Sequence, residues 1–173
     1  MRWNILITGG RVIDPFQGID GIRDVAIEGT RVAEIGENLP ADQAETVIDA
    51  GGKVVTAGFI DLHVHNYTSR GSKPSVDSDT TNLAFGVTTA LDAGTATPAE
   101  YPHYWESDIQ NTKVRLYSLV RMPDPYGPDP SSVGEVKDLI TSYDTLIGVK
   151  FHHSQHFASL PLAREAADFG GGI

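Results

Sequence analysis

The sequence predicts an α/β protein in two parts. Residues 1–56 contain short runs in which apolar and polar residues alternate, separated by Gly, Asp and Asn, which is typical of β-strands joined by turns. From residue 57 onward, a strand pattern followed by a helix pattern occurs four times, at roughly 30 residues per repeat. We therefore expect a small antiparallel β-unit, then about four β/α units of a partial (β/α)8 TIM barrel over residues 57–173.

The β-unit is predicted from the runs NILITG, RVID, DVAIEG, RVAEIG, TVIDA and KVVT. Between the third and fourth runs, the step Glu28-Gly29-Thr30-Arg31 supplies the glycine that a tight hairpin requires. These runs predict strands that pair with their neighbours along the chain.

The α/β unit is predicted from four strand patterns, GFIDLHVH, VTTALDAG, KVRLYSLV and LIGVKFHH. Pro98 and Pro161 are expected in the first turns of helices, and Gly86 and Gly170 at helix ends. The expected helices lie near residues 77–85, 98–110, 131–143 and 160–169.

The α/β unit has too few residues for a whole barrel. A (β/α)8 barrel takes about 250 residues, whereas only the 117 residues from 57 to 173 are available here. A half barrel would leave strand edges and an apolar inner face uncovered. We therefore expect a fragment of a longer sequence or one half of a split assembly, whose partner is a missing C-terminal half or a homo-oligomer partner.

Composition excludes several classes of function. The 23 acidic and 13 basic side chains give a net charge of −10, so we expect neither nucleic acid nor an anionic membrane as a partner. The absence of cysteine excludes disulfides and thiolate zinc sites, so a metal would need histidine or carboxylate ligands. No apolar run approaches the ~20 residues that span a bilayer, and we expect a cytoplasmic protein.

The pattern with the clearest chemistry ends the first barrel strand. In Gly58–His65, strand alternation places His63 and His65 on one face with Asp61, at the carboxyl end where barrel active sites lie. Two imidazoles on one rigid strand can bind one zinc-like ion. Taken alone, such a pair is more often a surface or core feature of an ordinary strand than a metal site.

Several segments together resemble the amidohydrolase superfamily, most closely its dihydroorotase, hydantoinase and adenine-deaminase-like branch. They are ILITGGRVIDP with DVAIEGTRVAEIG, then VIDAGGKVVTAGFIDLHVH, GVTTALDAGT and GVKFHHS. The resemblance implies that residues 1–56 form an incomplete β-sandwich subdomain and that His63 and His65 bind metal. It also implies a metal-dependent amidohydrolase that cuts a C–N bond of a small-molecule substrate, a cyclic amide or N-acyl compound.

Lys150, on the fourth barrel strand, is the third candidate ligand. A lysine at a barrel mouth loses hydration, which lowers its pKa and allows the neutral amine to add carbon dioxide. Proteins that resemble this sequence use a carboxylated lysine at the matching position, which implies two divalent metal ions, with zinc the expected metal, and a carbamate on Lys150. The alternative is a lysine that is exposed or paired with Asp92 or Asp61.

Other polar residues are candidates for supporting roles. Asp92 could orient a ligand histidine from the second layer or cap the loop that follows it. His152 shares a strand face with Lys150, whereas His153 and His156 are expected to be packing or solvent residues.

Tyr67 stands where dihydroorotases that resemble this chain carry an arginine that holds the substrate carboxylate. The acid of a substrate could be held instead by Arg70, Arg121 or Lys73. The possible second-layer or substrate residues are thus Asp92, His152, Tyr67 and Arg70.

The resemblance also implies parts that these residues do not supply, namely two later histidine ligands and a catalytic general-base aspartate. Two other functions stay open. One is a non-catalytic half barrel that acts as an assembly or regulatory subunit. The other is a nucleobase deaminase, for which Lys150 would be unnecessary.

Overall fold

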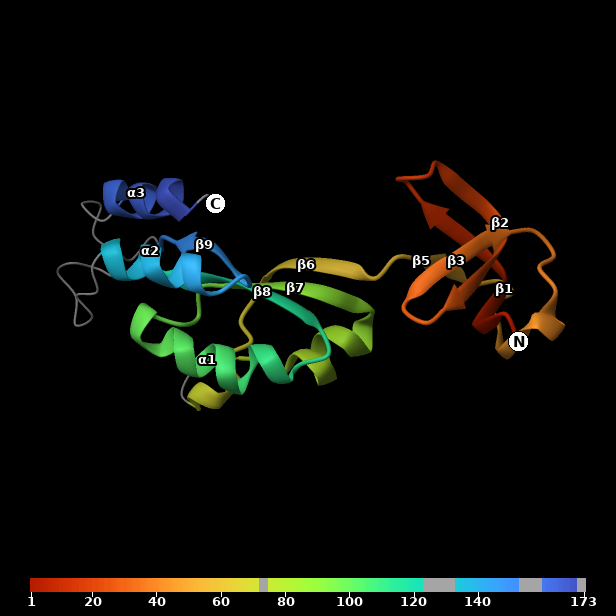
Figure 1. The fold of residues 1–173 in the computed structure, drawn as a ribbon, viewed down its shortest axis with the longest axis horizontal. Helices are drawn as coiled ribbons and strands as arrows, with labels where there is room; N and C mark the ends of the chain where they lie inside the picture. The colour runs from red at the N-terminus through yellow and green to blue at the C-terminus, as the bar shows by residue number, and fades with distance from the viewer. Residues whose placement is uncertain (72–74, 123–132, 153–159, 171–173) are drawn as a thin grey trace. The chain divides into compact units, whose positions relative to one another are not determined.

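The computed structural model describes residues 1–71, 75–122, 133–152 and 160–170 (Figure 1). The chain divides into two compact units, Met1–Ala57 and Gly58–Ile173. The first unit consists of strands and turns, and the second alternates strands with helices. The division falls one residue after the boundary expected from the sequence.

The first unit is one five-stranded mixed sheet. Its strand order is β3-β2-β1-β4, with β5 also paired to β1. The β1-β2 and β2-β3 pairs are antiparallel, but β4 and β5 run parallel to β1. The expected antiparallel sheet is therefore correct for the first three strands and wrong for the last two. The strands are β1 (Trp3–Asp14), β2 (Ile19–Glu28), β3 (Arg31–Gly36), β4 (Ala44–Asp49) and β5 (Val54–Thr56).

The predicted hairpin between β2 and β3 is confirmed. Glu28 pairs with Arg31, so Gly29 and Thr30 make the turn. Gly29 has φ of 58°, a left-handed conformation that glycine adopts without steric strain. A small core of Trp3, Leu6, Ala26 and Ala44 lies against this sheet.

The second unit contains a four-stranded parallel sheet in chain order, β6-β7-β8-β9. All four strands lie inside the segments predicted from the sequence, or within one residue of them. The mixed α/β architecture is thereby confirmed. The strands are β6 (Phe59–Val64), β7 (Val87–Ala93), β8 (Arg115–Arg121) and β9 (Leu146–Lys150).

The predicted helices are also present, with one difference in type. The helix expected near residues 77–85 is one π-helical turn followed by a 3-10 turn, which Gly86 ends at φ of 79°. The next helix begins with a capping box, because Thr97 and Glu100 exchange side-chain and backbone hydrogen bonds. The helical segments are η1 (Ala41–Gln43), η2 (Thr68–Arg70), η3 (Ser78–Asn82), η4 (Leu83–Phe85), η5 (Pro98–Glu100), α1 (Tyr101–Ser107), η6 (Ile109–Asn111), α2 (Val133–Ser142) and α3 (Leu160–Gly170).

A single apolar core joins the parallel sheet to its helices. Buried side chains of β7 and β8 meet Tyr101 and Tyr104 of α1 and Val136 of α2. Helices α2 and α3 pack on each other and on β9. This arrangement leaves the carboxyl ends of the strands open to the loops that follow them.

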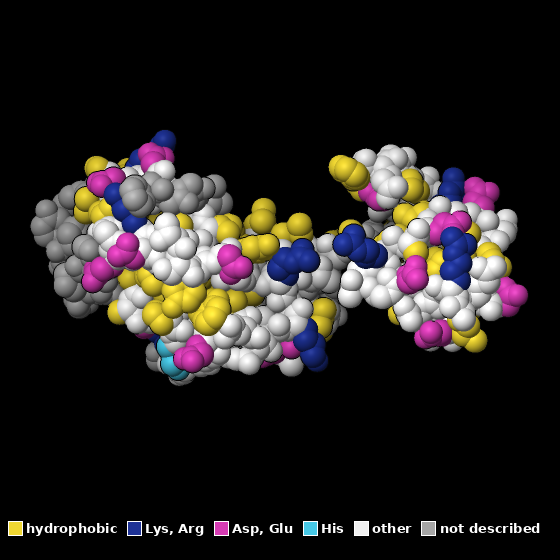
Figure 2. All heavy atoms as spheres, viewed as in Figure 1, with side chains coloured by type: hydrophobic (Ala, Val, Ile, Leu, Met, Phe, Trp, Pro, Cys, Tyr) yellow, Lys and Arg dark blue, Asp and Glu magenta, His cyan; other side chains and the backbone are white. Residues whose placement is uncertain are grey.

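Strand β6 lies at one edge of the parallel sheet and exposes apolar side chains. Phe59, Ile60 and Leu62 are 59%, 64% and 71% exposed. Figure 2 shows acidic side chains spread over the visible faces of both units, in keeping with the net charge of −10. None of the helices in the described ranges is long and apolar enough to cross a membrane.

Candidate metal site

The carboxyl end of β6 carries a β-bulge at the predicted His-x-His motif. Asp61 pairs with Ala90 and Val64 with Asp92, so two residues of β6 lie opposite one residue of β7. The Asp61 carboxylate accepts a hydrogen bond of 3.0 Å from the backbone N–H of His63. Because a bulge redirects the side chains beside it, simple strand alternation does not by itself describe how the two histidines are presented.

The structure brings His63 and His65 together. Both side chains are exposed, and their ring centroids lie 5.5 Å apart in an edge-to-face arrangement. With Zn–N bonds of about 2.0 Å and a tetrahedral angle, two imidazole centroids would stand roughly 5 Å apart. The spacing of the two rings therefore matches that of two imidazoles on one metal ion. The Nδ1 atom of His65 also lies 2.7 Å from the Thr95 hydroxyl.

Asp92, at the carboxyl end of β7, is fully buried and holds two loops. Its Oδ1 accepts the backbone N–H of Thr95 at 2.7 Å. Its Oδ2 accepts the backbone N–H of Asn66 and the Thr95 hydroxyl, each at 2.8 Å. Asp92 therefore caps the following loop. Its contact with His65 is indirect, through Thr95, and its role in orienting a ligand histidine stays a prediction.

Lys150 is the last residue of β9 and is half-buried. A Cβ atom built on Gly94, just after β7, would lie 2.4 Å from Lys150 Cβ and 2.8 Å from its Cγ. The stem of Lys150 therefore packs on Gly94, one residue before the threonine that contacts His65. Across the described residues, no hydrogen bond or ion pair joins the Lys150 amine to either imidazole.

Among the described residues, the histidine pair has no third ligand of the usual kind. In the ranges that the structure describes, no three His, Cys, Asp or Glu side chains form a group that could hold a metal ion. Lys150 would join such a set only as a carbamate. Residues 153–159, with His153 and His156, and residues 72–74, with Lys73, lie outside the described ranges, and His152 is exposed just after β9.

Tyr67 lies in the core instead of at the strand ends. Its ring is 4% exposed and stacks at 4.6 Å on Tyr104, and its hydroxyl lies 2.8 Å from Nδ1 of His103 on α1. Burial, and then the charge of Glu100, raise the pKa of the Tyr67 phenol. Packing and the contact with His103 thus engage this side chain, and its role as a possible second-layer or substrate residue stays a prediction.

Arg70 ties the loop after β6 to the loop after β7. Its guanidinium forms an ion pair with Glu100 and donates a 2.9 Å hydrogen bond to the carbonyl of Thr95. The side chain is only 18% exposed. Glu100 in turn accepts from the backbone N–H and hydroxyl of Thr97. Arg70 therefore supports the loop that carries Thr95.

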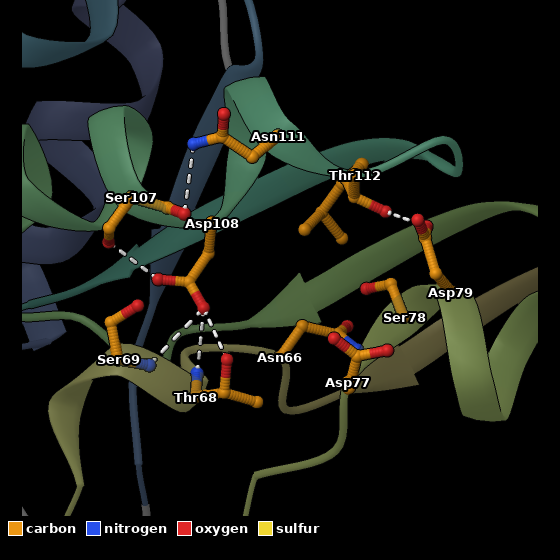
Figure 3. A pocket seen from close by; sticks show the side chains of 11 residues that line it. Asn66, Thr68, Ser69, Asp77, Ser78, Asp79, Ser107, Asp108, Asn111 and Thr112 are labelled. Carbon is orange, nitrogen blue, oxygen red and sulfur yellow. Dashed lines mark hydrogen bonds between the residues drawn. The ribbon is translucent and has the colours of Figure 1, made fainter.

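A polar cavity of about 120 Å³ lies between η3, α1 and the loop after β6 (Figure 3). Asp108 accepts from Ser107 and from the backbone and hydroxyl of Thr68. Burial alone would raise its pKa, but the bonds from Ser107 and Thr68 lower it. Asp79 accepts from Thr112, which is the main reason for its lowered pKa. These carboxylates thus serve as internal acceptors that fasten turns.

A shallower groove of about 380 Å³ lies between η5 and α2, where Figure 2 shows hydrophobic side chains gathered. Pro98 and Tyr143 contribute apolar surface, and Asp138 contributes charge. No histidine is among the described residues that line this groove, so the histidine pair remains the candidate metal site.

Two site residues escaped the sequence reasoning. Thr95 follows Gly94 in the LDAGT segment, and its hydroxyl contacts His65. Asn66 follows the His-x-His motif, and its backbone binds Asp92. The sequence does contain one signal for this loop. Thr97-x-x-Glu100 is the pattern of a capping box and predicts a helix start just after Thr95.

Comparison with known proteins identifies relatives of the amino-terminal part. No protein-family model matches the chain. A dihydroorotase of Geobacter sulfurreducens is 52% identical over 62 residues, which are 36% of this chain and 15% of that protein. Because the aligned stretch is a small share of that enzyme, it identifies a related segment of sequence and not a whole enzyme.

Solved structures match nearly the whole chain. An adenine deaminase superposes with a TM-score of 0.81 at 22% identity, covering 99% of this chain and 49% of that one. A dihydroorotase gives a TM-score of 0.81 at 20% identity, covering 97% and 49%. An N-acyl-D-glutamate deacylase from Bordetella bronchiseptica, solved with zinc, gives 0.68 at 21% identity, covering 97% and 43%. The chain spans about half the length of the first two structures, and these matches show a shared fold. The resemblance to dihydroorotases is confirmed by the 52% identity over 62 residues.

Proposed function

We propose that this chain is the amino-terminal part of a metal-dependent amidohydrolase that cleaves the C–N bond of a cyclic amide or N-acyl compound. The observation that carries the proposal is the histidine pair at the carboxyl end of β6, whose ring centroids lie 5.5 Å apart. That spacing suits two imidazoles on one ion. The 52% identity to a dihydroorotase over 62 residues supports a cyclic amide as the substrate class.

In this proposal the second unit is the first half of a TIM barrel and the first unit is an incomplete β-sandwich. Four parallel strands in chain order with helices between them support the barrel half. The exposed apolar side chains of β6 support a missing neighbour at that edge. Further barrel strands, from a C-terminal half or from a second copy of the chain, would cover it.

Three residues of this chain would hold the metal ions, His63, His65 and Lys150. As an ammonium group Lys150 would repel a cation, so it would have to carry carbon dioxide as a carbamate, whose two oxygens and negative charge suit two divalent ions. Zinc is the expected metal. When bound, such ions would lower the pKa of a water molecule toward 7 and polarise the amide carbonyl. The aspartate that accepts the proton of that water would come from outside these residues.

The direct test compares this chain with the same chain extended by any coding sequence that follows it. We expect the chain alone to bind zinc but to hydrolyse dihydroorotate, hydantoin and N-acyl amino acids poorly or not at all. The extended protein should hydrolyse one of these classes in a zinc- and bicarbonate-dependent manner. Fast turnover by the chain alone would contradict the proposal.

Matched variants locate the metal within this chain. His63→Ala and His65→Ala should each abolish stoichiometric zinc binding, measured by metal analysis after dialysis. His103→Asn, which changes a histidine on α1, should retain it. Equal zinc binding by all three variants would show that the histidine pair is not the site.

Nucleobase deamination is the second candidate, because the adenine deaminase structure matches as well as the dihydroorotase, with TM-scores of 0.81 for both. Release of ammonia from adenine that persists in Lys150→Met would favour this reaction, since a deaminase would not need the carbamate.

A non-catalytic half barrel is the third candidate, and the exposed β6 edge is the observation that favours it. This candidate would be supported if light scattering showed a stable symmetric dimer and neither the chain alone nor the extended protein hydrolysed an amide.

A further inference from the structure

The hydroxyl of Thr95 lies between a buried carboxylate and a proposed metal ligand. Thr95 Oγ1 is 2.8 Å from Asp92 Oδ2 on one side and 2.7 Å from Nδ1 of His65 on the other. Thr95 is 6% exposed and Asp92 is fully buried, so solvent does not compete for the contact between them. One hydroxyl therefore connects the interior of the unit to an exposed imidazole.

The direction of both hydrogen bonds follows from what each group can donate. Asp92 receives the backbone N–H groups of Thr95 and Asn66, one on each oxygen, and a backbone amide can only donate. The carboxylate therefore acts as an acceptor on both oxygens. A hydroxyl has a single proton, and that of Thr95 goes to Asp92. Its oxygen must then accept from His65, which places a proton on Nδ1 of the imidazole.

Thr95 is held in place on three sides, so the position of its hydroxyl is fixed before any ligand binds. Asp92 binds its backbone N–H and its hydroxyl, and Arg70 donates to its carbonyl at 2.9 Å. The ion pair of Arg70 with Glu100 anchors that guanidinium in turn. Preorganised second-layer contacts of this kind set the orientation of a metal-binding imidazole.

The other histidine of the pair has no such support. In the described ranges, no hydrogen bond reaches a ring nitrogen of His63, although its backbone N–H donates to the Asp61 carboxylate. The two imidazoles are therefore unequal. His65 is fixed in both position and tautomer, whereas His63 is fixed only by the strand that carries it.

We propose that Thr95 is a positioning residue, which holds His65 as the Nδ1–H tautomer and so turns the lone pair of Nε2 outward for coordination. This inference rests on the proposed metal site for its purpose, but the tautomer itself is a property of the metal-free chain. A free neutral histidine side chain in water favours the opposite tautomer, with the proton on Nε2. The contact with Thr95 therefore has a signature that packing alone would not produce.

Long-range ¹H–¹⁵N correlation spectra of the metal-free chain, recorded where the imidazole is neutral, test the proposal. The wild-type chain should show the Nδ1–H tautomer at His65. Thr95→Val, which keeps the shape of the side chain and removes the hydroxyl, should shift His65 to the Nε2–H tautomer. Thr95→Ser restores the hydroxyl and should show the wild-type spectrum. An Nε2–H tautomer in the wild-type chain overturns the proposal even if the valine variant fails to fold.

Zinc affinity, measured by competition with a chelator, gives the second readout. Loss of a second-layer partner weakens metal binding by about 10–100-fold, so we expect that loss for Thr95→Val and wild-type affinity for Thr95→Ser. If the valine variant folds and keeps both the wild-type tautomer and the wild-type affinity, the inference is wrong. If the tautomer is as predicted but no form binds zinc, the proposed function fails while the assignment of the tautomer to Thr95 stands.

Discussion

Replacing Asp92 with asparagine removes one charge and one acceptor from the most buried polar group of the candidate site. The wild-type carboxylate accepts three hydrogen bonds of 2.7–2.8 Å, from two backbone amides and one hydroxyl. An asparagine of the same shape offers a single oxygen. Whichever way its amide is turned, the NH₂ group faces the backbone N–H of either Thr95 or Asn66, so at least one buried donor is left without an acceptor.

The cost can be worked out from these contacts. A buried donor without an acceptor costs about 1–3 kcal/mol, and the bonds that remain lose the charge that strengthened them, at about 1 kcal/mol in total. The expected loss is therefore about 2–4 kcal/mol of unfolding free energy. For a unit of roughly 120 residues, each kcal/mol corresponds to about 4 °C in melting temperature. Asp92→Asn should thus lower the melting temperature of the second unit by about 8–16 °C.

Differential scanning calorimetry at neutral pH measures this shift. The matched control is Asp144→Asn, which makes the same change of charge at an exposed position between α2 and β9. The control should melt within about 2 °C of the wild-type chain, because single exposed charges contribute little. If Asp92→Asn melts as the control does, Asp92 does not hold the two loops, and the account of Thr95 loses its anchor.

Three further substitutions have expected outcomes. Gly94→Ala should be less stable than Gly71→Ala by about 1–3 kcal/mol in urea unfolding. Both glycines have positive φ, but only a Cβ on Gly94 would lie within 2.4 Å of another side chain. Equal losses would contradict the packing of the Lys150 stem on Gly94. Asp108 has a lowered pKa, so its stabilisation is present above the ordinary carboxyl pKa and is lost as the pH falls through the folded-state value. Asp108→Asn should therefore cost about 1 kcal/mol at pH 7, and this cost should shrink as the pH falls through the folded-state pKa of Asp108. A constant difference across the titration would show that the charge is not involved. Arg70→Met should cost about 1–3 kcal/mol of unfolding free energy, because its ion pair is partly buried. Arg164→Met, at an exposed pair, should leave the stability nearly unchanged, and similar losses in both variants would argue that Arg70 does not tie the two loops together.

The strands and helices of the second unit were predictable because their signals are local. Strand β7, for example, is a short segment rich in β-branched residues that ends before a glycine, and Pro98 marks the start of the next helix. The hairpin at Gly29 was predictable for the same reason, since only a few residue types adopt a positive φ. In contrast, the parallel pairing of β4 and β5 with β1 was missed, because alternation within a strand says nothing about the direction of its partner.

The candidate site was predictable as a set of residues but not as a network. The His-x-His spacing brought His63 and His65 together, as expected, yet the bulge that presents them depends on pairing with β7. The sequence placed Tyr67 in the loop after the motif but gave no direction for its ring, which packs into the core. The connection from Asp92 through Thr95 to His65 depends on three contacts between loops, which the spacing of residues in the sequence does not predict.

The central claim is that His63, His65 and the carboxylated Lys150 share metal ions at the carboxyl ends of the parallel strands. Anomalous diffraction at the zinc edge, from crystals grown with zinc and bicarbonate, tests this claim most directly. The account predicts a zinc peak at about 2.0–2.1 Å from ring nitrogens of both histidines, with additional density on the lysine amine directed toward the metal. Zinc bound elsewhere, or an unmodified lysine pointing away from the two rings, would contradict it.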